Sequence, residues 1–375
     1  MQDAIEPGFT AAAVAPASRT LDIRFTGSGS EYFRIWIVNM LLTLVTLGFY
    51  LPFAKARRIR YFYANTLIDG QALSFHGDPW KMFRGFVLLV ALFALYGGLS
   101  RFSPMLGGMA FVALVLLWPP LWRAGMRFRL THTSWRGLRF GFSGGVADAY
   151  KAFLPAAVPL ALLVATPQDA GAALAGLAGV AAIVFNFMVP WTLGLAKRYQ
   201  HNHYRYAQEQ ARTTLQPSQV YGLSFRAGLV GGLAAVVIGI TAAIVLPSVR
   251  QGGGWLVMIF LGLLYFMAYA VASSIFTAGL QNMAWSRTAS DSIRFKSDLE
   301  TMDLTKLTLM NWLLTALTLS LYRPFAAVAT ARLRLEAVTV ETTADIDAWA
   351  GDEAARNADA AGDFAGDFFG IDLGL

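Results

Sequence analysis

Two sets of neutral polar residues interrupt the most apolar parts of this 375-residue chain. The first set comprises Asn39, Thr43 and Thr46, and the second comprises Asn311, Thr315 and Thr318. Steps of four and three residues place each set on one face of a helix. Because amide and hydroxyl groups are costly to place against hydrocarbon, we expect these faces to avoid lipid tails. The chemistry open to them is hydrogen bonding, either to a polar ligand or to a neighbouring helix.

Both uses of these polar faces have physical support. In the functional interpretation they form a two-part polar site, where the two segments meet around a ligand near the membrane. In the structural interpretation they join helices by hydrogen bonds worth ~0.6 kcal/mol each, and the pattern favours this simpler role. Leucine at both Asn39 and Asn311 distinguishes the two, because a purely structural role leaves activity unchanged in a protein that still folds.

The two polar sets belong to a duplicated segment. Residues 39–54 and 311–326 are identical at ten of sixteen positions, with a constant offset of 272 residues and no gap. Duplication of this kind predicts that the two ends of the chain are structural equivalents. We therefore expect a fold built from internal repeats.

Ionisable groups offer little further chemistry. No Asp, Glu, Lys or His lies in the middle of an apolar stretch, which disfavours a proton-coupled pump. His201 and His203 form an H-x-H pair, but no acid is spaced to complete a metal site. The chain has no cysteine, which excludes disulfides and thiol chemistry. We expect no enzymatic activity, no metal and no cofactor.

A basic run follows the first copy of the duplicated segment. Its cations are Lys55, Arg57, Arg58 and Arg60, and aromatic residues come directly after them. Such a run resembles a nucleic-acid-binding patch. At a membrane edge, however, contact with anionic lipid headgroups is favoured, at ~1 kcal/mol per basic residue. We expect membrane lipids as partners, through anionic headgroups at the cytoplasmic loops, and no nucleic acid.

The composition indicates which elements position these residues. The chain is 56% hydrophobic and 14% charged, whereas soluble domains carry ~25% charged residues. Eight apolar stretches approach the length of a membrane helix; they are 33–53, 83–100, 105–122, 153–166, 171–195, 228–249, 255–280 and 307–329. The expected fold is an all-α polytopic membrane protein with about eight membrane helices built from internal repeats.

Three of these stretches leave alternatives open. The fourth is short and contains Pro155 and Pro159, so it is either kinked or completed by residues nearer Tyr150. The first and the eighth either span the membrane or re-enter it by bending near residues 46–48 and 318–320. Their length favours spanning, whereas the basic residues beside them favour placing both chain ends in the cytoplasm.

Basic residues are concentrated in four loops, over residues 54–84, 123–151, 197–226 and 287–306. These loops hold 21 of the 30 Lys and Arg residues, so the positive-inside rule predicts that all four are cytoplasmic.

Short triplets of apolar, polar and aromatic residues accompany these loops. They are Ile23–Phe25, Leu73–Phe75, Leu138–Phe140, Leu223–Phe225 and Ile293–Phe295. Their alternation is typical of half-buried strands, and Gly27, Gly77 and Gly144 follow three of them as a turn would require. We expect short extended segments that pair with one another at the cytoplasmic face.

The chain divides into three parts. Residues 1–22 are interpreted as a flexible N-terminal leader, residues 23–340 as a repeated multi-pass membrane domain, and residues 341–375 as an acidic, largely disordered tail. The tail holds nine acidic residues and one arginine. It either docks on the basic cytoplasmic loops or acts as a solubilising tail with no partner.

The string from Thr46 to Tyr63, TLGFYLPFAKARRIRYFY, resembles the signature of the YjgN-like family. Asn65 and Thr66 match the N-T dipeptide that follows in that family. Phe53 stands where the family usually has Trp, and the second copy of the segment departs further. The resemblance extends from Phe25 to about residue 340. It implies a multi-pass protein of the bacterial inner membrane, with a domain of unknown function (898) and no assigned catalytic residue.

Two functions fit these features. The first is transport or binding of a small molecule or lipid, supported by the repeats and the neutral polar residues. The second is a non-catalytic membrane scaffold or lipid-sensing regulator that acts through its basic loops. A connected cavity favours the first function, and a solid, dry bundle favours the second.

Overall fold

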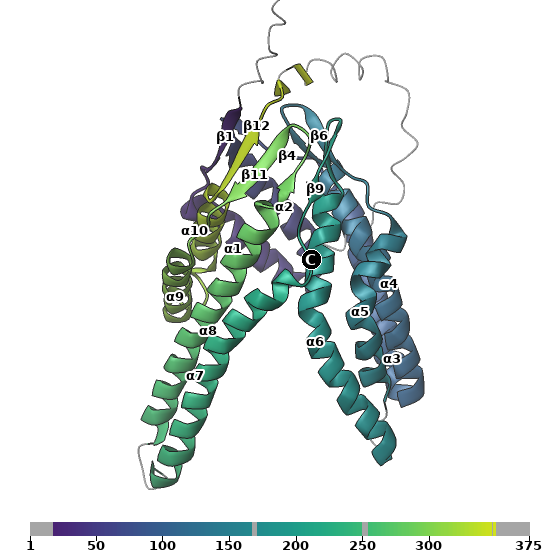
Figure 1. Ribbon diagram of the computed structural model, residues 1–375, viewed down its shortest axis with the longest axis vertical. Helices are drawn as coiled ribbons and strands as arrows, with labels where there is room; N and C mark the ends of the chain where they lie inside the picture. The colour runs from purple at the N-terminus through teal and green to yellow at the C-terminus, as the bar shows by residue number, and fades with distance from the viewer. Residues whose placement is uncertain (1–17, 167–170, 250–253, 347, 350–375) are drawn as a thin grey trace, which may run out of the picture.

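The computed structural model describes residues 18–166, 171–249, 254–346 and 348–349. The helices are α1 (Gly29–Val45), α2 (Leu51–Ala64), α3 (Pro79–Phe102), α4 (Pro104–Thr131), α5 (Val146–Ala165), α6 (Ala172–Asn202), α7 (Gln219–Val249), α8 (Gly254–Trp285), α9 (Thr301–Leu317) and α10 (Arg323–Glu336). The strands are β1 (Arg19–Phe25), β2 (Thr66–Ile68), β3 (Gln71–Ala72), β4 (Ser74–Phe75), β5 (Thr133–Trp135), β6 (Leu138–Phe142), β7 (Tyr204–Tyr206), β8 (Glu209–Gln210), β9 (Arg212–Thr213), β10 (Thr288–Ala289), β11 (Ile293–Ser297) and β12 (Val338–Thr342). Pairs of helices therefore alternate with short strands. The strands gather at one end of the molecule, and α3 to α8 extend away from them (Figure 1).

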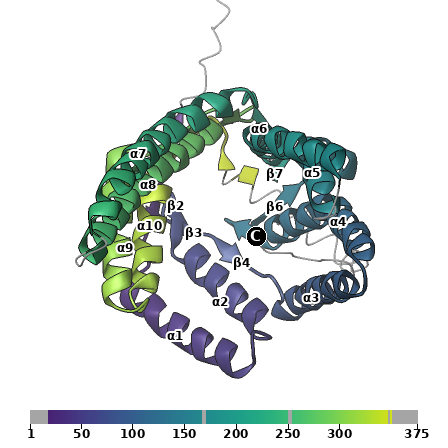
Figure 2. The ribbon, with the colours of Figure 1, turned by 90° about the horizontal axis from the view of Figure 1, so that it is seen from below.

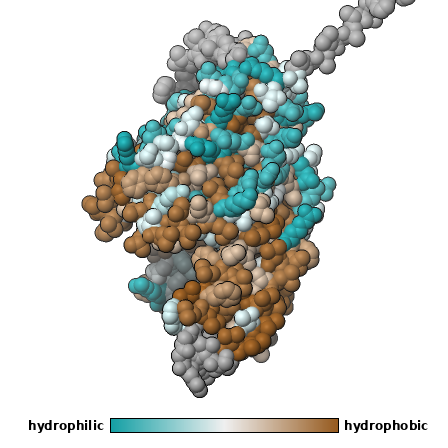
Figure 3. All heavy atoms as spheres, turned by 90° about the vertical axis from the view of Figure 1, so that its left-hand side faces the viewer, coloured by the Kyte–Doolittle hydropathy of each residue, from teal (hydrophilic) through white to brown (hydrophobic). Residues whose placement is uncertain are grey.

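Six of the described helices, α3 to α8, are long and apolar enough to cross a membrane. Large apolar side chains on them face outward, among them Leu95, Ile183 and Ile244. Figure 3 shows hydrophobic residues covering the helical part of the molecule, with hydrophilic residues concentrated at the strand end. An outward apolar surface on helices is what a lipid environment requires. The expectation of about eight membrane helices is corrected to six candidate spans.

The first and eighth apolar stretches are not among the candidate spans, because each is broken in the middle. Residues 46–50 separate α1 from α2, and residues 318–322 separate α9 from α10. The backbone is left-handed at Gly48 (φ 95°) and Ser320 (φ 75°), as it is at the leucine before each. A right-handed helix cannot continue through such angles. Each stretch is therefore a helical hairpin that bends where the re-entrant alternative predicts.

The two hairpins have matching dimensions. Helices α1 and α9 each contain 17 residues, and α2 and α10 each contain 14. The two helices of each hairpin pack against each other, and α10 also packs against α1. Segments from opposite ends of the chain thus lie side by side.

The fourth apolar stretch lies within α5. This helix begins at Val146 and contains Pro155 and Pro159 in its interior. The stretch is therefore completed by residues nearer Tyr150, which extend it to 20 residues.

Two antiparallel sheets form the strand end. One has the order β3-β2-β1-β12-β11-β10-β9, and the other has the order β4-β5-β6-β7-β8. Strand β1 pairs with β12, so that Arg19 lies opposite Thr342 and Asp22 lies opposite Thr339. The fold is mostly helical, as expected, and the all-α expectation is corrected only in that the short strands form these two sheets. The expected pairing of short extended segments is confirmed.

Four of the five predicted triplets lie in strands or directly beside one. Leu223–Phe225 is the exception, since it lies inside α7. The strands of that region, β7 to β9, lie earlier in the chain, before Pro217. An alternation of three residues is too short to distinguish a strand from one turn of a helix.

Glycines follow three of the strands because of close packing rather than turn geometry. Gly27, Gly77 and Gly144 lie outside the left-handed region. A Cβ at Gly27 or Gly77 would lie 2.7 or 2.2 Å from the phenylalanine ring two residues earlier, and one at Gly144 would lie 2.4 Å from the Tyr199 hydroxyl. The turn explanation is corrected, because any side chain here would displace a buried aromatic ring.

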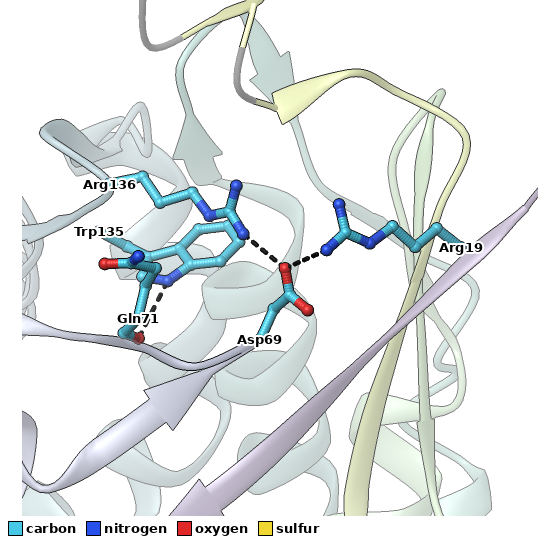
Figure 4. A network of polar contacts seen from close by, with 5 residues as sticks. All are labelled: Arg19, Asp69, Gln71, Trp135 and Arg136. Atoms are coloured by element: carbon cyan, nitrogen blue, oxygen red, sulfur yellow. Dashed lines mark hydrogen bonds and ion pairs between the residues drawn. The ribbon is translucent and has the colours of Figure 1, made fainter.

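A charged network joins the two sheets (Figure 4). Asp69, in the turn between β2 and β3, accepts hydrogen bonds from Arg19 Nη2 at 2.6 Å and Arg136 Nη2 at 2.5 Å. Arg136 belongs to the turn between β5 and β6 of the other sheet. Beside it, Trp135 Nε1 donates to the Gln71 carbonyl at 3.2 Å. These contacts connect the sheets across a gap that no strand pairing bridges among the described residues.

The packed region extends past both expected domain boundaries. Strand β1 begins at Arg19, within the expected leader, and β12 ends at Thr342, within the expected tail. Ile346 is buried in a cluster with Leu21. Residues 1–17 and 350–375, which hold most of the expected leader and tail, lie outside the described residues.

Seen from below, the helices form a ring with the strands at its centre (Figure 2).

Candidate functional site

A cavity of about 1090 Å³ lies between the helices and the strands. Helices α2, α4, α8, α9 and α10 contribute to its wall, and strands of both sheets contribute the rest. Ile23 of β1 and Val340 of β12 both line it, so the two ends of the described chain meet there. A connected cavity at the centre of the ring is the feature that the sequence could not locate.

The charged residues on the cavity wall are mostly cations. The arginines are Arg58 on α2, Arg129 on α4, Arg205 on β7, and Arg323 and Arg334 on α10. Among the described lining residues, Glu209 on β8 is the only acid. The wall is therefore strongly positive.

The carboxylate of Glu209 already has protein partners. Its Oε1 accepts a hydrogen bond from Ser292 Oγ at 2.9 Å, and its Oε2 accepts one from the Asp291 amide at 3.0 Å. Burial alone would raise the pKa of Glu209, but the hydrogen bonds from Ser290, Ser292 and the Asp291 amide outweigh it and lower the pKa. Glu209 therefore stays ionised at neutral pH, with its charge held at the turn between β10 and β11.

Arg334 is oriented by a reciprocal pair of hydrogen bonds. Its Nε donates to Gln281 Oε1 at 2.8 Å, and Gln281 Nε2 donates to the Arg334 carbonyl at 2.8 Å. Arg334 lines the cavity at an exposed position of α10, and partial burial of its guanidinium lowers the pKa of Arg334. An arginine remains protonated at neutral pH despite such a shift. The pair thus fixes a cation on α10 by an amide on α8.

Arg129 lies on the opposite side of the ring, close to Tyr204. Burial raises the pKa of Tyr204, and the nearby charge of Arg129 opposes that effect only in part. The Tyr204 hydroxyl is therefore a neutral donor at physiological pH. Together the two side chains offer a cation and a hydroxyl at one place on the wall.

Apolar side chains make up much of the remaining wall. They include Phe62, Leu130, Phe140, Trp285, Phe295 and Trp312. A cavity that combines an apolar lining with a few polar groups has the general character of a small-molecule site.

The structure separates the members of the two predicted polar faces. Asn311 and Thr315 line the cavity, whereas Asn39 and Thr43 do not. Asn311 is buried, and its Nδ2 donates to Thr330 Oγ1 at 3.2 Å. Within the described part of the chain, the Oδ1 atoms of Asn39 and Asn311 have no donor, and no hydrogen bond joins the two residues. The C-terminal face alone reaches the cavity.

Thr46 and Thr318 lie at the breaks between the hairpin helices. The Thr46 hydroxyl donates to the carbonyl four residues earlier at 2.8 Å and accepts from the amide four residues later at 3.0 Å. The Thr318 hydroxyl makes the same two bonds at 2.6 and 3.0 Å. These threonines satisfy backbone groups that the end of one helix and the start of the next leave open.

The basic run of α2 spreads over different environments. Arg58 lines the cavity, and Arg60 Nη2 donates to the Gly77 carbonyl at 3.0 Å. Arg57 is exposed and lies over the Tyr50 ring at 5.6 Å. Lys55 is half-buried. The four cations therefore do not form one surface, and headgroup contact stays a prediction for them.

The histidines make separate local contacts. His201 Nδ1 lies 2.8 Å from Thr288 Oγ1, whereas His203 Nδ1 lies 2.7 Å from the Tyr199 carbonyl. The described residues contain no group of three or more His, Cys, Asp or Glu side chains that could hold a metal ion.

Sequence reasoning missed the arginines of α4 and α10. Arg129 and Arg334 each lie four residues before a strand, since β5 begins at Thr133 and β12 begins at Val338. This spacing would identify the two arginines only if the starts of the strands that follow the helices were already known.

Comparison with known proteins identifies the family. A family model described as "Bacterial protein of unknown function (DUF898)" matches residues 20–368. This chain belongs to the DUF898 family. No solved structure matches it.

Its relatives include proteins named inner membrane protein YjgN. The YjgN of Salmonella typhimurium (strain LT2) is 26% identical over 332 residues, which cover 81% of this chain and 84% of that protein. The YjgN proteins of Escherichia coli K12 and O157:H7 are 36% identical over 120 residues, or 32% of this chain and 30% of their own length. The match thus spans less than a third of the E. coli proteins. Together with its six apolar helices, these relatives identify the chain as an inner-membrane protein.

Proposed function

We propose that this DUF898 chain binds a small molecule or lipid in the central cavity and moves it through or within the membrane. The observation that carries this proposal is the cavity itself, at about 1090 Å³. Drug-sized ligands occupy pockets of roughly 300–1,000 Å³. A solid, dry bundle would instead favour a scaffold.

The arrangement of the hairpins supports a repeat-based transport mechanism. In many transporters, sites lie where internal repeats meet, and broken helices contribute polar groups to them. Here both hairpins are broken helices, and each contributes to the cavity, with Arg58 from the first and Asn311 from the second. We propose that they are copies of one internal repeat and that their helices move relative to each other during transport.

The proposal contains no catalytic step. Glu209, the only acid among the described lining residues, is held by Ser292 and a backbone amide. General acid–base chemistry needs a group free to exchange a proton with the substrate. We further propose that exposed basic residues such as Arg57 contact anionic lipid headgroups on the cytoplasmic side, as the positive-inside rule predicts.

Cysteine accessibility tests this function, since the chain has no cysteine of its own. Ala331 lines the cavity, and Ala331→Cys introduces a single thiol there. A membrane-impermeant maleimide is applied to right-side-out and to inverted membrane vesicles. We expect labelling from both sides if the cavity opens alternately, because the thiolate reacts only where water reaches it.

Two further variants make the labelling interpretable. Ala91→Cys, on the exposed face of α3, is a lipid-facing control that should resist the reagent on both sides. Arg57→Cys, exposed outside the cavity, reports which side carries the basic loops. Labelling of Ala331→Cys from one side only would support binding without transport. An unreactive thiol would contradict the proposal and favour the scaffold.

A further inference from the structure

The described residues that line the cavity carry more cations than acids. Five arginines line it, against one glutamate that already accepts three hydrogen bonds. Arg58 and Arg334 form no ion pair with a carboxylate of the described residues. A further cation, Lys197 of α6, lies close enough to interact electrostatically with Arg334. Like charges gathered on one wall repel one another, and a bound anion relieves that repulsion.

The arginines also have a geometry suited to one class of anion. Gln281 holds the Nε of Arg334, so the guanidinium plane is fixed before any ligand arrives. Its terminal nitrogens have no acceptor within the described part of the chain. A fixed, planar fork pairs with the oxygens of phosphate or carboxylate through two parallel hydrogen bonds. The neutral Tyr204 hydroxyl beside Arg129 offers one more donor.

The rest of the wall excludes a bare inorganic anion as the complete ligand. Phe62 and Leu130 lie near the cationic groups in sequence, and Trp285 and Trp312 add aromatic surface from α8 and α9. Phosphate alone would leave these apolar groups facing water. Apolar surface contributes to binding only when the ligand covers it, at roughly 25 cal/mol per Å².

We infer that the cavity holds an anionic amphiphile, with its phosphate-type or carboxylate head on Arg58, Arg129 and Arg334 and its apolar part on the aromatic wall. This inference rests on the proposed function and specifies its substrate class. The head could belong to an anionic membrane lipid or to a soluble amphiphilic anion. The shared chemistry is the acidic head joined to an apolar body.

Native mass spectrometry of the solubilised full chain measures this preference. The protein is titrated with phosphatidylglycerol, with phosphatidylcholine of the same acyl chains, with a soluble alkyl phosphate, and with inorganic phosphate. We expect phosphatidylglycerol or the alkyl phosphate to bind about tenfold more tightly than phosphatidylcholine, given the strength of charge-assisted hydrogen bonds. Whichever of the two binds more tightly identifies the source of the head. Equal binding of the anionic and the zwitterionic lipid, or inorganic phosphate as the tightest ligand, would overturn the inference.

A neighbouring arginine supplies a matched control. Arg58→Gln and Arg129→Gln remove cavity cations, whereas Arg127→Gln removes an exposed cation from the same helix as Arg129. We expect about tenfold weaker binding of the anionic ligand for each cavity variant and less than twofold for Arg127→Gln. Equal effects from Arg129→Gln and Arg127→Gln would show surface attraction and overturn the inference. Arg334→Lys keeps the charge but loses the fork, and an intermediate loss is expected if the head is bound by two parallel bonds.

The outcome separates this inference from the proposed function. If Ala331→Cys is labelled but no anionic preference is found, the cavity serves another ligand class and only the inference fails. If that thiol is unreactive from both sides, the proposed function fails as well.

Discussion

The two helical hairpins share one backbone but present different side chains to the cavity. At the constant offset of 272 residues, Arg58 and Phe62 of α2 correspond to Thr330 and Arg334 of α10, and all four line the cavity. The cation of the second hairpin therefore lies one helical turn nearer the strands than that of the first. The comparison shows which features the duplicated geometry requires and which are free to differ.

The features that the hairpins share are structural. Arg60 Nη2 donates to the Gly77 carbonyl at 3.0 Å, and its counterpart Arg332 donates through Nη2 to the Gly27 carbonyl at 2.9 Å. Each arginine thereby joins a helix to the glycine that follows a strand. The threonines at the two breaks make equivalent hydrogen bonds in the same way. The duplicated sequence thus maintains the bend and the attachment to the sheet.

The largest expected effect comes from replacing a cavity-lining side chain of the second hairpin with its equivalent from the first. Arg334→Phe removes the cation that Gln281 orients, so binding of phosphatidylglycerol should weaken about tenfold or more. Adding Thr330→Arg to that variant moves the cation back by one turn and should restore part of the affinity. Native mass spectrometry measures both. Identical affinity in the wild type and in Arg334→Phe would show that the two faces are equivalent.

The next effect tests the bend that the hairpins have in common. Gly48→Ser should destabilise the protein by about 1–2 kcal/mol, because a side chain is strained at φ 95°. Ser320→Gly should stabilise it by up to about 1 kcal/mol, since serine there adopts φ 75°. Thermal unfolding of the purified protein checks both variants. Shifts of the same sign would contradict the shared geometry.

A smaller effect separates the two asparagines. Asn311→Leu should weaken ligand binding severalfold, because Asn311 lines the cavity and holds Thr330. Asn39→Leu should leave binding unchanged and alter stability by less than about 1 kcal/mol. Parallel binding and unfolding measurements on the two variants decide. If Asn39→Leu weakens binding as much as Asn311→Leu, the first polar face also acts in the site.

The smallest effect concerns Glu209, the only acid among the described residues that line the cavity. The folded-state pKa of Glu209 is lowered, so its contribution to stability is present above the ordinary glutamate pKa of ~4.3 and is lost as the pH falls below it. Glu209→Gln should therefore lower the unfolding temperature at pH 7, and the difference from wild type should shrink toward pH 3. Glu341→Gln, at an exposed position of β12, is the control. A difference independent of pH would mean that the carboxylate charge contributes no stability.

Local signals in the sequence were enough to predict much of this fold. Apolar length is a local property, so it located α3 to α8, and alternation located the strands β1, β4, β6 and β11. The breaks were harder to place, because Gly48 suggests a left-handed turn whereas Ser320 does not. The closure of the ring by β1 and β12 depends on contacts between residues more than 300 positions apart in the chain, which no local pattern encodes.

The candidate site was less predictable for a physical reason. The positive-inside rule already explains the four basic loops, so arginine there is not a signal of a binding site. Which arginine lines the cavity depends on how each helix is rotated about its axis relative to the strand that follows it. Arg58 and Arg129 line the cavity, whereas Arg57 and Arg127 do not. Asn311 and Thr315 were identified from helical spacing alone, whereas the equivalent spacing of Asn39 and Thr43 led to a position outside the cavity.

The central claim is that the cavity binds an anionic amphiphile between the helices of the ring. An electron cryo-microscopy structure of the full chain in phosphatidylglycerol nanodiscs tests it most directly. We expect elongated density inside the cavity, with the ligand's head against Arg129 and Arg334 and its apolar part along Trp285 and Trp312. A cavity that is empty or filled by side chains, with lipid density only on the outer faces of α3 to α8, would contradict it.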